Sequence, residues 1–162
     1  MLFRSKVITL GKALLFPGAI EALGDLGEGL STEVWWSPSH PFSSSLTKQS
    51  AKALADAYEA STKKQWTQPI GFAHALFEVA ADTLRRAKSA QASDVRDALA
   101  ATQLQTVVGQ VKWGGAGPMR NVSKTPLVLG QWVKGTKFRT QLVIVDNQSA
   151  PNIPTGGSLK LL

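Results

Sequence analysis

QPIGFAHALFEVAADTLRRAK, residues 68–88, carries the clearest helical pattern in the chain. Pro69 suits the first turn of a helix, where its missing N–H is not needed, and Asp82 and the two arginines are expected to face outward. Apolar side chains recur at the i, i+3, i+7 spacing of one helix face, namely Ile70, Ala73, Phe77, Ala80 and Leu84. The segment therefore predicts a long helix whose apolar stripe faces a core.

Two further helices are predicted around this one. Serines at 43–45 offer N-caps for a helix before it. Ser93 is the expected N-cap of a shorter helix after it, which pairs Val95 with Leu99. The first of these helices carries its apolar face on Leu46, Ala53, Leu54, Ala57 and Tyr58. All three faces need a sheet to pack against.

Strand patterns flank the helices on both sides. The β-branched run 6–10 predicts a buried strand, and residues 30–36 predict a second one that ends at the prolines of 37–41. Residues 106–113 predict a later strand. A final hairpin is expected over 127–146, with its tight turn at 134–137. The tail after it lacks periodicity and is expected to trail over the surface.

Composition limits the possible classes of protein. The 162 residues, 43% hydrophobic and 18% charged, suit a folded domain of ordinary size. The absence of cysteine excludes disulfides and thiolate metal sites. No window approaches the ~20 apolar residues that a membrane-spanning helix needs. Residues 1–5 are too short for a secretory signal, so we interpret them as a non-native or disordered start.

The net charge of +7 raises the possibility of a nucleic-acid partner. The basic pairs at 63–64 and 85–86 lie at the ends of helical patterns, where cations complement the helix dipole. The sequence has no basic stripe interleaved with aromatic residues. We therefore expect no nucleic-acid partner.

One short pattern is compatible with an enzyme. Ser45 and Lys48 fit the S-x-x-K spacing of Ser-Lys acyl transferases, but no S-D-N follows and residues 134–136 have the wrong order for K-T-G. Ser45 as a helix cap explains the same residues. His40 and His74 are too isolated for a triad or a metal site. We expect no catalysis, no metal and no cofactor.

Four segments occur in an order that resembles a known family: GDLGEGL at 24–30, QWTQPIGFA at 65–73, VGQVKW at 108–113 and GQWVKG at 130–135. Together they look like the C-terminal part of a type I periplasmic binding protein. The chain is similar to the branch that serves branched-chain amino acid and related ABC importers. The likeness spans residues 6–145.

The resemblance implies an α/β fold with two lobes, each a three-layer α/β/α structure, joined by a hinge that the chain crosses repeatedly. The N-terminal half of that fold is absent. The expected divisions are residues 6–36 in the second lobe, 37–41 as a hinge crossing, 42–115 in the first lobe, 116–126 as another crossing, 127–147 back in the second lobe and 148–162 as a tail.

The implied function is that of a periplasmic solute-binding component of an ABC importer. It would enclose a small polar or aromatic carboxylate, or an amino acid, in the cleft between the lobes and deliver it to a membrane permease. Because most ligand-gripping loops of the first lobe are missing, this chain alone is expected to bind weakly. The alternative is an independently folded basic interaction domain with no small-molecule ligand.

The resemblance also implies where a ligand would bind. Lys12 follows the first strand, where amino-acid-binding relatives place an acidic residue, and a lysine there can hold a carboxylate. A solvated loop cation is the alternative. Phe72 and Gln68 are expected to line the pocket, with helix packing as the alternative for Phe72. Trp36 is a further candidate, although it and Trp35 point to opposite faces of a strand.

Overall fold

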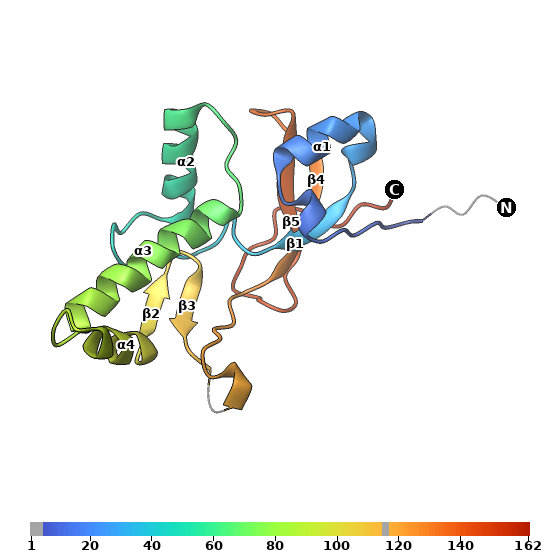
Figure 1. Ribbon diagram of the computed structural model, residues 1–162. Coiled ribbons are helices and arrows are strands. Elements are labelled where there is room, and N and C mark those ends of the chain that lie inside the picture. Colours follow the sequence, from blue (N-terminus) through green and yellow to red (C-terminus); the bar gives the residue numbers. More distant parts are fainter. Residues whose placement is uncertain (1–4, 115–116) are drawn as a thin grey trace.

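The computed structural model describes residues 5–114 and 117–162 and shows a mixed α/β chain (Figure 1). One sheet has three antiparallel strands in the order β1-β4-β5. A separate hairpin is formed by β2 (Gln103–Thr106) and β3 (Gly109–Lys112). The strands of the larger sheet are β1 (Ser31–Val34), β4 (Val128–Lys134) and β5 (Thr140–Asp146). The predicted α/β class is confirmed. The predicted start, 1–5, falls almost entirely outside the described residues.

Helices occupy both ends of this arrangement. The α-helices are α1 (Pro17–Leu23), α2 (Ala51–Thr62), α3 (Pro69–Arg86) and α4 (Ala92–Ala100). The shorter 3-10 turns are η1 (Lys12–Leu14), η2 (Gly24–Gly27) and η3 (Gly117–Met119). None of the helices in the described part of the chain is both long and apolar enough to cross a membrane.

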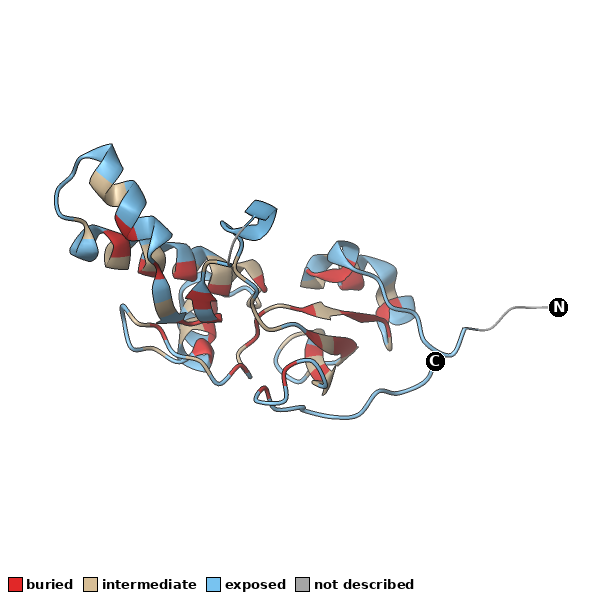
Figure 2. Cartoon of the chain, turned by 90° about the horizontal axis from the view of Figure 1, so that it is seen from below, coloured by how far each residue is buried: buried red, intermediate tan, exposed pale blue. Residues whose placement is uncertain are grey.

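The buried apolar residues form two clusters (Figure 2). The sheet cluster packs α1 and the C-terminal segment against the three-stranded sheet, and it comprises Leu14, Ile20, Leu30, Val34, Val128, Trp132, Leu142, Ile144, Ala150 and Ile153. The helix cluster joins α2, α3 and the β2–β3 hairpin through Trp36, Ala51, Ala55, Ala75, Val107, Val108 and Val111. Trp66 packs against both.

Helix α3 begins at Pro69 as predicted, but its predicted inner face is wrong. The side chains of Phe77 and Leu84 are 71% and 65% exposed. The buried positions are instead Gly71, Ala75, Glu78 and Thr83. Small residues on this face let Trp36 approach the helix closely. No described sheet covers the opposite side, so the apolar stripe remains exposed there.

Helix α2 starts later than its serines suggested. Its N-cap is Ser50, whose hydroxyl accepts a hydrogen bond from the Ala53 N–H at 3.1 Å. The serines at 43–45 instead lie in a turn in which Ser44 Oγ accepts from two backbone N–H groups. Such local bonds compete with helix formation. The buried face therefore consists of Ala51, Ala55 and Glu59, while Ala53 and Ala57 are exposed.

The start of α4 and the extent of the strand predicted over 106–113 also differ from the prediction. Helix α4 is preceded by Gln91, which makes no side-chain cap, rather than by Ser93. The single strand predicted over 106–113 is instead the turn and second strand of a hairpin over 103–112, in which Gly109, the first residue of β3, adopts a φ of 102°. A positive φ of this size is accessible mainly to glycine.

The segment 6–10 is not the buried strand that its sequence predicted. It makes an isolated parallel bridge to β1 at Thr9, while Val7, Ile8 and Leu10 are each about two-fifths exposed. One edge of this segment is hydrogen-bonded to β1, and no strand among the described residues pairs with its other edge. The tail is exposed over 154–162, as expected, but it is held in place: the Leu162 N–H donates to the Lys6 carbonyl at 2.9 Å.

Candidate ligand-binding site

Three of the four predicted site residues meet where β1 leads into the helical part of the chain. The Gln68 side chain lies at the start of α3 and is fully buried. Its Oε1 accepts from the Trp35 N–H at 2.7 Å, and its Nε2 donates to the Glu33 carbonyl at 3.0 Å. The amide thus accepts from one backbone group at the end of β1 and donates to another, in the way that the backbone of a neighbouring strand does. Gln68 positions α3, and each of its two amide atoms already has a backbone partner.

Trp36 is a core residue. Its side chain has no exposed surface, its indole N–H donates to the Val107 carbonyl at 3.1 Å, and it packs edge-on against Trp66. Trp36 as a ligand contact stays a prediction, and in this structure its ring has no surface open to solvent. Trp35, the residue before it, is half-buried and packs against Phe72 instead.

Phe72 and Trp35 form the accessible aromatic surface at this place. Their rings are 6.1 Å apart between centroids and nearly perpendicular, at 85°. This edge-to-face arrangement is favourable for aromatic pairs. Both residues are half-buried, so each retains surface that a flat or apolar ligand group can contact.

Lys12 lies beside the same strand. Backbone hydrogen bonds of 2.9 Å join Ser31 to Ile8 and Leu10, so the loop that begins at Gly11 runs along β1. A Cβ on Gly11 would lie 3.8 Å from Glu33 Oε1, so the Glu33 carboxylate adjoins the loop. Lys12 follows directly and is exposed. The loop that carries Lys12 therefore passes close to the Glu33 carboxylate.

We name the group Lys12, Glu33, Trp35 and Phe72 the cleft surface. Glu33 and Trp35 were missed from the sequence. Glu33 and Trp35 lie two positions apart, so an extended segment places their side chains on the same face. That alternation could have pointed to both residues. The residues of the cleft surface include a cation, an anion and an aromatic pair, which are the groups that a small zwitterion or carboxylate requires.

The S-x-x-K residues do not form a Ser-Lys pair. Ser45 Oγ donates to Glu78 Oε1 at 2.9 Å, and Lys48 Nζ donates to the Ser45 carbonyl at 3.0 Å. His74 Nε2 lies 2.8 Å from Ser44 Oγ, but Ser44 is buried and its hydroxyl already caps a turn. These serines hold the loop 43–50 against α3.

His40, in the segment 37–41, makes the stability of the fold depend on pH. Burial lowers its pKa from 6.5 to about 4, despite an opposing interaction with the Ser37 backbone. The unfolded chain therefore binds more protons between these two values, so stability falls as the pH is lowered through them. We expect the free energy of unfolding to drop by about 2 kcal/mol between pH 7 and pH 5 from this group.

Urea denaturation at several pH values measures this slope. His40→Asn retains an acceptor for the Ser37 N–H, which donates to His40 Nδ1 at 3.1 Å, but cannot titrate. The Asn variant should lose the dependence between pH 5 and pH 7. An unchanged slope in the variant would contradict the assignment to His40.

Comparison with solved structures shows that the fold is a known one. The chain matches the leucine-binding protein LivK of Thermotoga maritima with a TM-score of 0.64 at 17% identity, over 88% of this chain and 37% of that one. It matches the branched-chain amino acid transporter substrate-binding protein LivJ of Streptococcus pneumoniae, solved with isoleucine, with a TM-score of 0.58 at 16% identity, over 85% of this chain and 37% of that one.

A further match is an ABC transporter solute-binding protein of R. palustris solved with benzoate, with a TM-score of 0.53 at 16% identity, over 90% of this chain and 36% of that one. No protein-family model and no curated protein sequence matches the chain. The chain spans a little over a third of the length of these structures and has the fold of part of an ABC-transporter substrate-binding protein. The fold inferred from the four segments is confirmed.

Proposed function

We propose that the chain is the part of a periplasmic solute-binding component of an ABC importer that contributes the cleft surface. The helix cluster would belong to one lobe and the sheet cluster to the other, with crossings at 37–41 and 116–126. Residues 115 and 116, at the second boundary, lie outside the described residues. The bound solute would be passed to a membrane permease, with no chemical change.

The observation that supports this proposal is the Trp35–Phe72 ring pair just after β1, with Glu33 on that strand and Lys12 in the loop that runs along it. Lys12 suits a ligand carboxylate, and Glu33 suits an ammonium group. The aromatic pair suits a hydrophobic side chain or ring. Two of the matched structures contain ligands of these kinds, isoleucine and benzoate. Glu33 supports an amino acid as a candidate, and Lys12 suits any carboxylate.

The test is an NMR titration of the ¹⁵N-labelled chain with isoleucine and with benzoate at millimolar concentrations. Lys12→Ala and Phe72→Ala should weaken both ligands, by about tenfold each, which is the effect of losing ~1.4 kcal/mol. Glu33→Gln should weaken isoleucine but leave benzoate unchanged, because benzoate has no ammonium group. Lys88→Ala, which removes an exposed lysine beyond the end of α3, is the matched control.

Shifts that saturate and map to the cleft surface support the proposal. Unchanged spectra with both ligands, or equal effects of Lys12→Ala and Lys88→Ala, would favour the alternative of a basic interaction domain.

A further inference from the structure

A separate cavity lies between α2 and the turn that joins β4 to β5. Its volume is about 220 Å³. Its walls come from α2, from 37–39, from 65–66 and from 135–142. None of the four residues of the cleft surface lines it. We name it the hairpin cavity.

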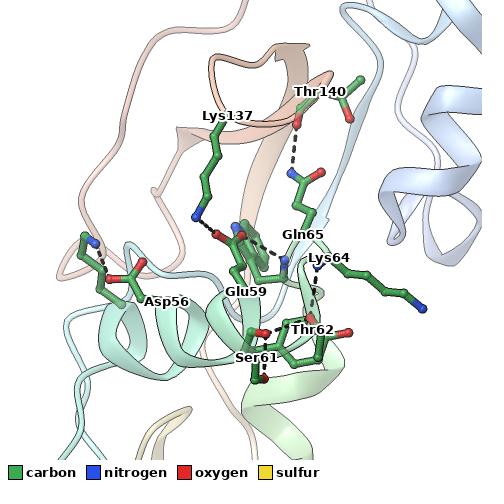
Figure 3. Close-up of polar contacts among 11 residues, drawn as sticks. Asp56, Glu59, Ser61, Thr62, Lys64, Gln65, Lys137 and Thr140 are labelled. Carbon is green, nitrogen blue, oxygen red and sulfur yellow. Dashed lines mark hydrogen bonds and ion pairs between the residues drawn. The ribbon is translucent and has the colours of Figure 1, made fainter.

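The hairpin cavity contains a buried carboxylate. The Glu59 side chain is only 7% exposed. Its Oε1 accepts from the Trp66 N–H at 3.1 Å, and its Oε2 accepts from Lys137 Nζ at 2.5 Å (Figure 3). An ionised carboxylate offers about four acceptor positions, so Glu59 can accept further donors.

Two more polar atoms in the walls are buried and have no partner within the described residues: Gln65 Oε1 and Thr140 Oγ1. The same two residues are joined by a bond of 2.9 Å from Gln65 Nε2 to the Thr140 carbonyl (Figure 3). A buried acceptor without a donor costs about 1–3 kcal/mol. A ligand that supplies N–H donors would remove part of this cost.

Lys137 shows what kind of group the cavity accepts. Its side chain is 66% exposed and reaches from the hairpin turn to Glu59 on α2 (Figure 3). Its ammonium nitrogen also lies 5.5 Å from the centroid of the Phe138 ring. A carboxylate and an aromatic ring around an ammonium group are features of sites for organic cations. The Lys137 ammonium group therefore occupies the position at Glu59 that the ammonium group of such a ligand would take.

We propose that the hairpin cavity binds a small primary ammonium compound, whose N–H donors replace those of Lys137 at Glu59 and also reach Gln65 Oε1. Phe138 and Trp66 supply apolar surface for a short carbon chain. Asp56 is a nearby anion, although it pairs with Lys52 at 2.6 Å. The proposal does not depend on the function proposed for the cleft surface.

The net charge of +7 does not prevent binding of a cation. At physiological ionic strength exposed charges are screened beyond about 8 Å, so the local groups dominate. The buried Glu59 is screened less than exposed lysines farther away. Measurements at about 0.15 M salt therefore test the local site.

The experiment is an NMR titration of the complete 162-residue chain with n-butylammonium chloride. Tetramethylammonium, which has no N–H, and n-butyrate, which has the opposite charge, are the comparison probes. Saturable shifts at Trp66 and at the β4–β5 turn are expected with n-butylammonium alone. Lys137→Ala should tighten its binding about tenfold because the internal competitor is gone, and Glu59→Gln should weaken it at least tenfold.

Lys134→Ala is the matched control, since Lys134 pairs with Glu28 at 3.7 Å and does not line the hairpin cavity. It should leave affinity unchanged. Urea midpoints establish that Glu59→Gln is folded, and the gain expected for Lys137→Ala cannot arise from misfolding. The proposal is overturned by equal responses to tetramethylammonium, by unsaturable shifts in both the wild type and Lys137→Ala, or by equal affinities of Lys137→Ala and Lys134→Ala.

Discussion

Gly71→Ala is expected to lower the free energy of unfolding by about 2–3 kcal/mol, although alanine is the better helix former. An added Cβ at Gly71 would lie 2.4 Å from the ring atoms of Trp36. The ring cannot easily retreat, because it is fully buried, bonded to the Val107 carbonyl and packed against Trp66. The helix must therefore shift away from the core.

Gly18→Ala is the matched control for this substitution. Gly18 lies in α1, and a Cβ there would meet nothing within 4 Å. This variant should be neutral or stabilised by up to about 1 kcal/mol. Urea denaturation followed by tryptophan fluorescence compares the two. Equal stabilities of the two variants would mean that the Trp36–Gly71 contact does not constrain α3.

Glu78→Ala is expected to destabilise the chain by about 3 kcal/mol or more. The Glu78 side chain is 1% exposed, and Oε2 accepts from the Val107 N–H at 3.0 Å. Its Oε1 accepts from the Ser45 N–H and hydroxyl. Alanine would leave these buried donors without an acceptor and release both the loop 43–50 and the β2–β3 turn from α3.

Glu21→Ala, at an exposed position of α1, is the comparison and should change stability by less than about 0.5 kcal/mol. Thermal or urea unfolding of both variants gives the difference directly. If Glu78→Ala were as mild as Glu21→Ala, the three hydrogen bonds to Glu78 would be replaceable by water, and the site would be open to solvent.

These two residues matter for the cleft surface because they fix α3. Gly71 sets how closely the helix approaches Trp36, and Glu78 holds it to the hairpin. Gln68 and Phe72 lie at the N-terminal end of the same helix. Loss of either constraint should therefore also move Phe72 relative to Trp35, which the isoleucine and benzoate titrations would detect.

The sequence brought several neighbouring residues to attention, but not the contact that each one makes. Gln68, Phe72 and Trp36 do lie together. The sequence could not show that Gln68 has both amide atoms bonded to β1 or that Trp36 faces inward. Burial of a side chain depends on residues distant in sequence, such as Val107 against Trp36. Lys12 stays a prediction.

By itself the sequence determined the α/β class, the long helix after Pro69 and the final hairpin. These follow from local rules: periodicity, prolines and turn residues act within a few positions. Only the tertiary structure decided which face of α3 is buried, that Ser50 rather than Ser45 caps α2, and that Glu59 meets Lys137. The physical reason is that the local pattern shows only that an apolar stripe or a carboxylate requires a packing or hydrogen-bonding partner. The residues that supply this partner come from a distant part of the chain.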